Sequence, residues 1–189
     1  MLNIYFENTD KFSYDGTQLR SHFILEKFGL RCDAMVAWVG GCLVETKELV
    51  DQEDRLQGDR IVSESMVHFI AEFFELNLKE TVFFQRLMVA RLAEILRVSA
   101  PKTVENIRVS GDDIFIGDAK LTVSIATRSP VSCLIHFGVN IDATGAPVKA
   151  IGLTDVGIKS LNWVPEFLEA MQQELATIQW ACAKVRPVV

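Results

Sequence analysis

The pattern of apolar residues changes its period close to residue 100. Across Leu78–Arg97 apolar residues recur about every 3.6 residues, which predicts a long helix with a wide, buried apolar arc. Farther along the chain apolar and polar residues alternate in short segments, as side chains do along a strand. Because helical and strand patterns occupy separate parts of the chain, we expect an α+β fold, without the regular alternation of a doubly wound sheet.

The predicted strands and helices define this architecture further. The alternating segments predict strands joined by short turns, namely Val104–Val109, Asp113–Ile116, Ala119–Arg128, Ser132–Asp142 and Val148–Leu153. Short connections favour antiparallel neighbours, so we expect a mainly antiparallel mixed sheet flanked by helices. The N-terminal half predicts strands over Leu2–Phe6 and Asp33–Val44, a helix from Thr17 to Gly29, helical turns with a loop over Glu45–Arg60, and a short helix over Ser63–Glu75.

A closing amphipathic helix is predicted after Pro165. Its apolar residues recur every three or four positions, as Leu168, Met171, Leu175, Ile178, Cys182 and Val185. This helix is expected to lie on the sheet, although its apolar stripe equally allows pairing with a second subunit in a homodimer. No repeat or flexible linker divides the chain of 189 residues, so we expect a single domain over residues 1–189.

Composition argues against several classes of partner. The net charge of −6 and the scattered basic residues do not form the positive surface that DNA binding requires. The four cysteines form no C-x-x-C pair and the three histidines lack zinc-site spacing, so we expect reduced thiols and no structural metal. Since no apolar run approaches the roughly 20 residues of a membrane span and the N-terminus lacks a leader pattern, we expect a cytoplasmic protein.

Two of the predicted strands carry a group of small and polar residues. Side-chain alternation places Lys120 and Ser124 on one face of their strand, and His136, Gly138 and Asn140 on one face of the next. If these strands pair as a hairpin, we expect all five residues to share a sheet face. The pattern alone leaves two interpretations open, a solvated sheet face or a polar floor beneath a ligand.

The same stretch resembles a known superfamily. Asp113-Ile-Phe-Ile-Gly-Asp-Ala-Lys120-Leu-Thr-Val-Ser124 resembles the strand, tight turn and lysine of biotin ligases, lipoate ligases and lipoyl transferases, and His136-Phe-Gly138-Val-Asn140 is similar to the strand that follows. Tyr14-Asp-Gly-Thr-Gln-Leu-Arg20-Ser-His22 resembles an uncharacterised archaeal and bacterial family, a domain of unknown function. The resemblance implies a biotin/lipoyl ligase-like, class II synthetase-like fold.

The resemblance also implies a function. It implies an enzyme that binds a nucleotide or an acyl carboxylate, with ATP and Mg²⁺ as cofactors and Lys120 as the catalytic group that stabilises the anion. Ser124, His136, Gly138 and Asn140 would line the ligand floor, and Arg20 would supply a second cation.

Two departures from the ligase pattern favour an alternative function. The chain lacks the Arg- and Gly-rich loop with which ligases cradle a nucleotide, and Thr154 lies in the stretch comparable to the one that carries the transferases' cysteine. The alternative is a non-catalytic module that binds a small ligand or a protein. A role with tRNA is disfavoured by the acidic charge.

Overall fold

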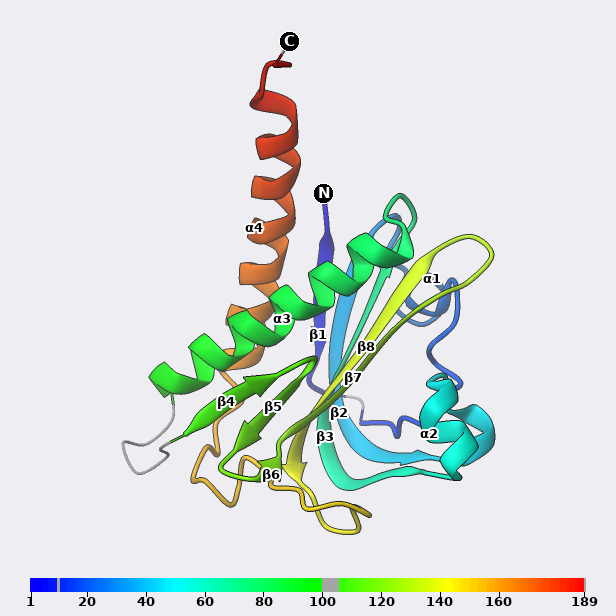
Figure 1. Cartoon of the computed structure of the whole chain (residues 1–189), viewed down its shortest axis with the longest axis vertical. Helices are drawn as coiled ribbons and strands as arrows, with labels where there is room; N and C mark the ends of the chain where they lie inside the picture. Colours follow the sequence, from blue (N-terminus) through cyan, green and yellow to red (C-terminus); the bar gives the residue numbers. More distant parts are fainter. Residues whose placement is uncertain (10, 100–105, 189) are drawn as a thin grey trace.

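The computed structural model describes residues 1–9, 11–99 and 106–188. In chain order its elements are β1 (Asn3–Glu7), α1 (Phe23–Phe28), β2 (Ala34–Val44), the 3-10 turn η1 (Thr46–Glu48), α2 (Gln52–Gln57), β3 (Ile61–Phe73), α3 (Leu78–Ser99), β4 (Ile107–Ser110), β5 (Asp113–Ile116), β6 (Ala119–Lys120), β7 (Thr122–Arg128), β8 (Cys133–Asp142) and α4 (Trp163–Lys184). Figure 1 shows the long sheet with α3 and α4 on one side and α1 and α2 beyond it.

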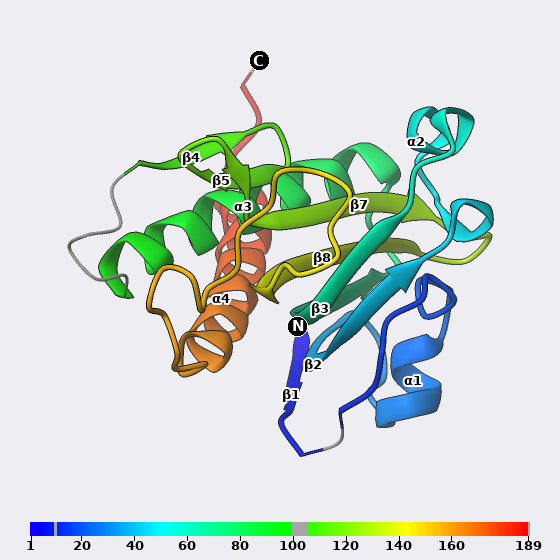
Figure 2. The same ribbon diagram turned by 90° about the horizontal axis from the view of Figure 1, so that it is seen from below.

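Most strands form one sheet in the order β1-β2-β3-β8-β7. Only the β1–β2 pair in this sheet is parallel, and the other neighbours are antiparallel. A second, three-stranded sheet, β4-β5-β6, lies beside β7, as the view from below shows (Figure 2). The expected α+β fold with a mainly antiparallel mixed sheet flanked by helices is therefore confirmed.

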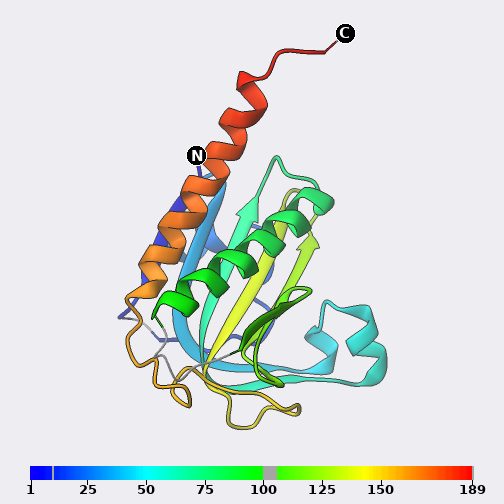
Figure 3. The same cartoon turned by 60° about the vertical axis from the view of Figure 1, so that its left-hand side comes forward.

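One sheet face packs against α3 and α4 (Figure 3). Phe69 of β3 and Phe137 of β8 are fully buried there, and the ring of Phe69 meets that of Phe167 of α4 edge to face at 5.1 Å. Met88 and Leu92 of α3 complete the contact. Burial of each such side chain contributes roughly 1.5–3 kcal/mol, so this layer is the main source of stability.

The opposite sheet face is also covered. Trp38 of β2 stacks on Phe12 with ring centroids 4.6 Å apart, and its indole N–H donates to the Phe12 carbonyl at 3.0 Å. Phe23 and Ile24 of α1 join the same cluster. Because both faces are buried, the central strands need apolar residues on both sides.

This double burial explains why the helix predicted over Ser63–Glu75 is wrong. The residues form β3, a central strand paired with β2 and β8, and all of them from Met66 to Phe73 are buried. A strand with two covered faces has no alternation of apolar and polar residues, and its continuous apolar run cannot be distinguished from a buried helix by period alone.

Smaller differences concern the ends of elements. The first helix starts at Phe23 and not at Thr17, because the Asp15 carboxylate accepts hydrogen bonds from the Thr17 backbone N–H and hydroxyl and closes a turn there. The helix ends at Gly29 as predicted. The strand predicted over Val148–Leu153 is wrong, since only Ala150 forms a bridge, with Lys120. The predicted strand Val104–Val109 corresponds to β4 from Ile107, and its first two residues lie outside the described residues.

The closing helix exists, but only its first half lies on the sheet. Phe167, Met171 and Leu175 are buried, whereas Ile178 and Val185 are exposed. Figures 1 and 3 show α4 continuing past the sheet edge. Within the described residues, no helix combines the length and apolar character that a bilayer span needs.

Candidate functional site

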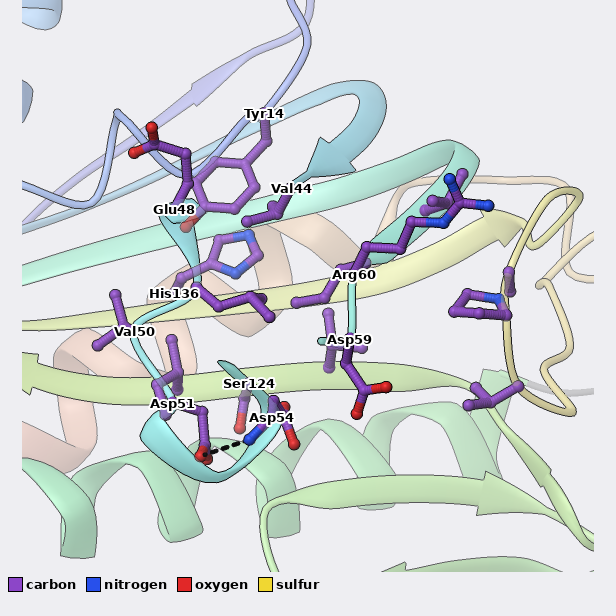
Figure 4. Close-up of a pocket in the computed structure, with 18 of the residues that line it drawn as sticks. Tyr14, Val44, Glu48, Val50, Asp51, Asp54, Asp59, Arg60, Ser124 and His136 are labelled. Atoms are coloured by element: carbon purple, nitrogen blue, oxygen red, sulfur yellow. Dashed lines mark hydrogen bonds between the residues drawn. The ribbon is translucent and has the colours of Figure 1, made fainter. Parts of the chain in front are cut away.

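A cavity of about 280 Å³ lies over the face of the β7–β8 hairpin that α3 and α4 leave open (Figure 4). The chain between β2 and β3, which carries η1 and α2, forms its other wall. The apolar lining residues are Leu19, Val44, Leu49, Val50, Ile61, Val62, Val123, Ile125, Ala146, Pro147, Val148 and Ala150. Of the sequence-predicted site residues, Lys120, Ser124, His136 and Asn140 border this cavity.

The register of the hairpin decides which of these side chains face the cavity. Val123 lies opposite Gly138 and Ile125 opposite His136, whereas Ser124 lies opposite Phe137 on the other face. The Ser124 hydroxyl accepts a hydrogen bond from Gln85 Nε2 of α3 at 2.7 Å and donates to the Asp112 carbonyl at 2.9 Å. The expectation that Ser124 shares a face with His136, Gly138 and Asn140 is therefore wrong, because this hydroxyl satisfies polar groups of α3 and the β4–β5 turn.

Lys120 lies where the chain passes from the small sheet to the large one. Its ammonium is 2.8 Å from Oδ2 of Asp113, and its side chain is 31% exposed. Burial raises the pKa of the Asp113 carboxyl, and Lys120 opposes that rise. The other oxygen of Asp113, Oδ1, is buried and has no hydrogen-bond partner among the described residues. Lys120 is thus a positive charge held by a carboxylate at one end of the cavity.

Three stacked rings form the opposite end. His136 stacks under Tyr14 with ring centroids 3.8 Å apart (Figure 4), and its Nε2 is 3.2 Å from Nδ1 of His68. Nε2 of His68 lies 3.3 Å from the carbonyl oxygens of both Gly40 and Gly41. Burial lowers the pKa of His68 to about 4 and holds that of His136 well below its usual value. Both imidazoles are therefore neutral at pH 7.

The remaining predicted residues have different roles. Asn140 borders the cavity and donates from Nδ2 to the Lys120 carbonyl at 3.4 Å, which ties β8 to the lysine. Gly138 lies on the same sheet face but under Met66, since a Cβ there would be 2.7 Å from Met66 Cε. Arg20 does not border the cavity; it pairs with Glu26 and is half exposed.

Acidic side chains that were not among the predicted site residues form one wall of the cavity. Glu48, Asp51, Asp54 and Asp59 line the cavity together with Arg60 (Figure 4). Burial is the main cause that raises the pKa of Asp54, and the negative charges of Asp51 and Asp59 raise it further. Within the described residues, no group of three or more His, Cys, Asp or Glu side chains is arranged to hold a metal ion. The acidic run over residues 45–54 was visible as a charge pattern, but its position over the sheet depends on β3 being a strand.

Comparison with known proteins identifies relatives of this chain. Residues 2–186 match the family described as Domain of unknown function (DUF366). An uncharacterized protein of Methanocaldococcus jannaschii is 31% identical over 187 residues, covering 95% of this chain and 83% of that protein. A structure described as a protein of unknown function from Pyrococcus horikoshi is 34% identical, with a TM-score of 0.92 and full coverage of both chains.

More distant structures share the fold. The biotin protein ligase of Aquifex aeolicus in complex with biotin and ATP has a TM-score of 0.54 at 12% identity, covering 92% of this chain and 70% of that one. Lipoate-protein ligase A bound with ATP has a TM-score of 0.51 at 13% identity, covering 92% and 83%. The expected ligase-like fold is confirmed, and the chain belongs to the DUF366 family.

Proposed function

We propose that the protein binds a small organic acid whose apolar body fills the cavity and whose carboxylate meets Lys120. The observation that carries the proposal is the position of Lys120, an ammonium held by Asp113 at one end of a cavity with mostly apolar walls. A lysine acts as a point charge that needs no fixed geometry from its partner, which suits a carboxylate at the end of a flexible chain. Biotin, which the Aquifex ligase binds, is an acid of this kind.

The volume of the cavity favours one small molecule. Its 280 Å³ lies just below the range of about 300–1,000 Å³ that is usual for ligand sites. An acid with a short chain or a small ring system suits this space better than an acid and a nucleotide together.

The charges around the cavity point the same way. The ionisable residues that line the cavity include four acidic residues, Glu48, Asp51, Asp54 and Asp59, and two basic ones, Lys120 and Arg60. A triphosphate would be repelled by this wall, whereas one carboxylate beside Lys120 is stabilised locally. Residues 59–77, which lead into α3, contain no glycine, so the chain offers no glycine-rich cradle for phosphates there. The residues present therefore fit an acyl carboxylate and do not fit ATP with Mg²⁺.

Calorimetric titration tests this proposal. Octanoate, lipoate and biotin are titrated into the wild-type protein, Lys120→Met and the control Lys149→Met, which removes an exposed ammonium outside the cavity lining. We expect at least one acid to bind the wild type and Lys149→Met equally, and Lys120→Met to bind it about tenfold or more weakly. Binding that is unaffected by Lys120→Met, or no binding of any acid, would contradict the proposal.

A second candidate function is a non-catalytic binding module. It is favoured by the absence of a glycine in residues 59–77 and by Thr154, whose hydroxyl donates to the Ile141 carbonyl at 2.8 Å and forms no hydrogen bond with a basic side chain among the described residues. Incubation with ATP, Mg²⁺ and the bound acid separates the two functions. Release of pyrophosphate that depends on Lys120 would establish a ligase-type enzyme, whereas acid binding without pyrophosphate release would establish the module.

A further inference from the structure

The hydrogen bonds of the two buried histidines fix the position of every ring proton. The carbonyl oxygens of Gly40 and Gly41 only accept hydrogen bonds, so His68 must carry its proton on Nε2. His68 is neutral, and its Nδ1 is therefore an acceptor. Nε2 of His136 consequently donates to that Nδ1, and a neutral His136 is left with an unprotonated Nδ1.

Two polar atoms in this ring cluster have no protein partner. Among the described residues, no hydrogen bond reaches Nδ1 of His136 or the hydroxyl of Tyr14. Both residues line the cavity, although only 2% of His136 and 3% of Tyr14 is exposed. Among the described residues, the fully buried side-chain N and O atoms without a partner are Asp113 Oδ1 and Trp163 Nε1, so the two atoms of the ring cluster are accessible from the cavity. A ligand group in the cavity would form the hydrogen bonds that the protein does not supply to them.

We infer that Tyr14 and His136 form a subsite for a neutral group that carries an N–H beside a hydrogen-bond acceptor. The N–H would donate to Nδ1 of His136, and the neighbouring acceptor would receive the Tyr14 O–H. Since the two rings are stacked 3.8 Å apart, one small group reaches both polar atoms. A cyclic urea, an amide or the edge of a purine carries this pair of atoms, whereas an alkyl chain or a dithiolane ring does not.

The inference rests on the proposed function and adds the far end of the ligand. His136 and Asn140 are four residues apart on β8, which corresponds to about 13 Å, and Asn140 donates a hydrogen bond to the backbone carbonyl of Lys120. Val123, opposite Gly138, lies on this face between the two ends, and Ile125 lies beside His136. The preferred ligand is therefore an elongated acid with an anionic end at Lys120, an apolar middle and a neutral N–H-bearing head at His136.

Ligands that differ at the head group test the subsite. Biotin carries a cyclic urea and a carboxylate, octanoate and lipoate carry a carboxylate without an N–H, and adenosine carries a purine edge without a carboxylate. Each is titrated into the wild type, Lys120→Met and Tyr14→Phe, which keeps the stacked ring and removes only the hydroxyl. Thermal unfolding of Tyr14→Phe confirms that the variant is folded.

We expect the wild type to bind biotin about tenfold or more tightly than octanoate and lipoate. Tyr14→Phe should reduce the affinity for biotin about tenfold and leave the affinity for octanoate unchanged. Equal affinities for biotin and octanoate, both insensitive to Tyr14→Phe, would overturn the subsite while the acid site at Lys120 stands. Adenosine binding that needs the Tyr14 hydroxyl, without any acid binding, would support the subsite with a purine ligand and overturn the proposed function. No binding of any probe would overturn both.

Discussion

The ammonium of Lys120 lies 2.8 Å from the Asp113 carboxylate, and both groups are mostly withdrawn from solvent. The pair joins β5 to the end of β6, which is the point where the chain crosses into the main sheet. Asp113 holds the ammonium at the cavity and leaves its own second oxygen buried without a partner. A ligand carboxylate would thus meet a lysine that is already positioned.

Asp113→Asn should remove a contribution to folding stability that decreases as pH rises. Burial raises the folded pKa of Asp113 above its usual value of 3.8, so the folded state holds the proton more tightly than the unfolded state. The stability that this group contributes is therefore present at low pH and is lost as pH rises through the folded pKa. Urea unfolding from pH 4 to pH 7 should show the free energy of unfolding of the wild type falling relative to Asp113→Asn. If the free energy of unfolding of the wild type minus that of Asp113→Asn stays constant or rises with pH, this expectation is wrong.

The two buried histidines should change folding stability with pH in the opposite direction, so that the protein becomes less stable as pH falls. Their folded pKa values are lowered from 6.5, that of His68 to about 4, so the stability they contribute is present above pH 6.5 and is lost as pH falls toward 4. His136→Phe keeps a ring under Tyr14 and removes one titrating group. Between pH 6.5 and 5 the variant should lose about 1 kcal/mol less per pH unit than the wild type. Parallel slopes would show that His136 is not held neutral in the folded protein.

Gly40→Ala should be strongly destabilising, and Gly41→Ala is its matched control. A Cβ at Gly40 would lie 1.9 Å from the Phe12 carbonyl oxygen, whereas one at Gly41 would meet its nearest atom at 3.4 Å. The Phe12 segment leads directly to Tyr14, so it cannot retreat without moving the ring over His136. Denaturant unfolding should show a loss of about 3 kcal/mol or more for Gly40→Ala and a clearly smaller change for the control. Equal losses would refute the contact.

Ending the chain at Ala176 should leave the fold intact. Every described residue after Leu175 is exposed, including Trp180 at 65%. We expect the free energy of unfolding to change by less than about 0.5 kcal/mol. Sedimentation at several concentrations then tests the predicted homodimer, which remains a prediction. A large loss of stability in the shortened chain would show that the end of α4 is covered in solution.

Sequence patterns predicted the elements whose apolar residues keep a clear period or whose ends carry turn residues. The α3 helix has a clear apolar arc, and β5, β7 and β8 alternate or end at glycine turns, so their positions followed from period and turn chemistry. The strand β3 was missed because both of its faces are buried. With β3 taken as a helix, the acidic connection before it could not be placed over the sheet.

The site was predictable only in part for a similar reason. Lys120, His136 and Asn140 were found because a lone lysine and small polar residues stood out on alternating strands. Ser124 was assigned to the wrong face because its hydroxyl accepts a hydrogen bond from Gln85 of α3, a partner that no local pattern reveals. Tyr14 owes its role to stacking on His136, which is 122 positions away in the sequence and close only in the folded chain.

A crystal structure of the protein with a bound acid such as biotin tests directly whether Lys120 holds the ligand carboxylate. We expect the ligand in the cavity beside β7 and β8, with its carboxylate about 2.7–2.9 Å from Nζ of Lys120. A ligand bound elsewhere, or one whose carboxylate points away from Lys120, would contradict the proposed acid site.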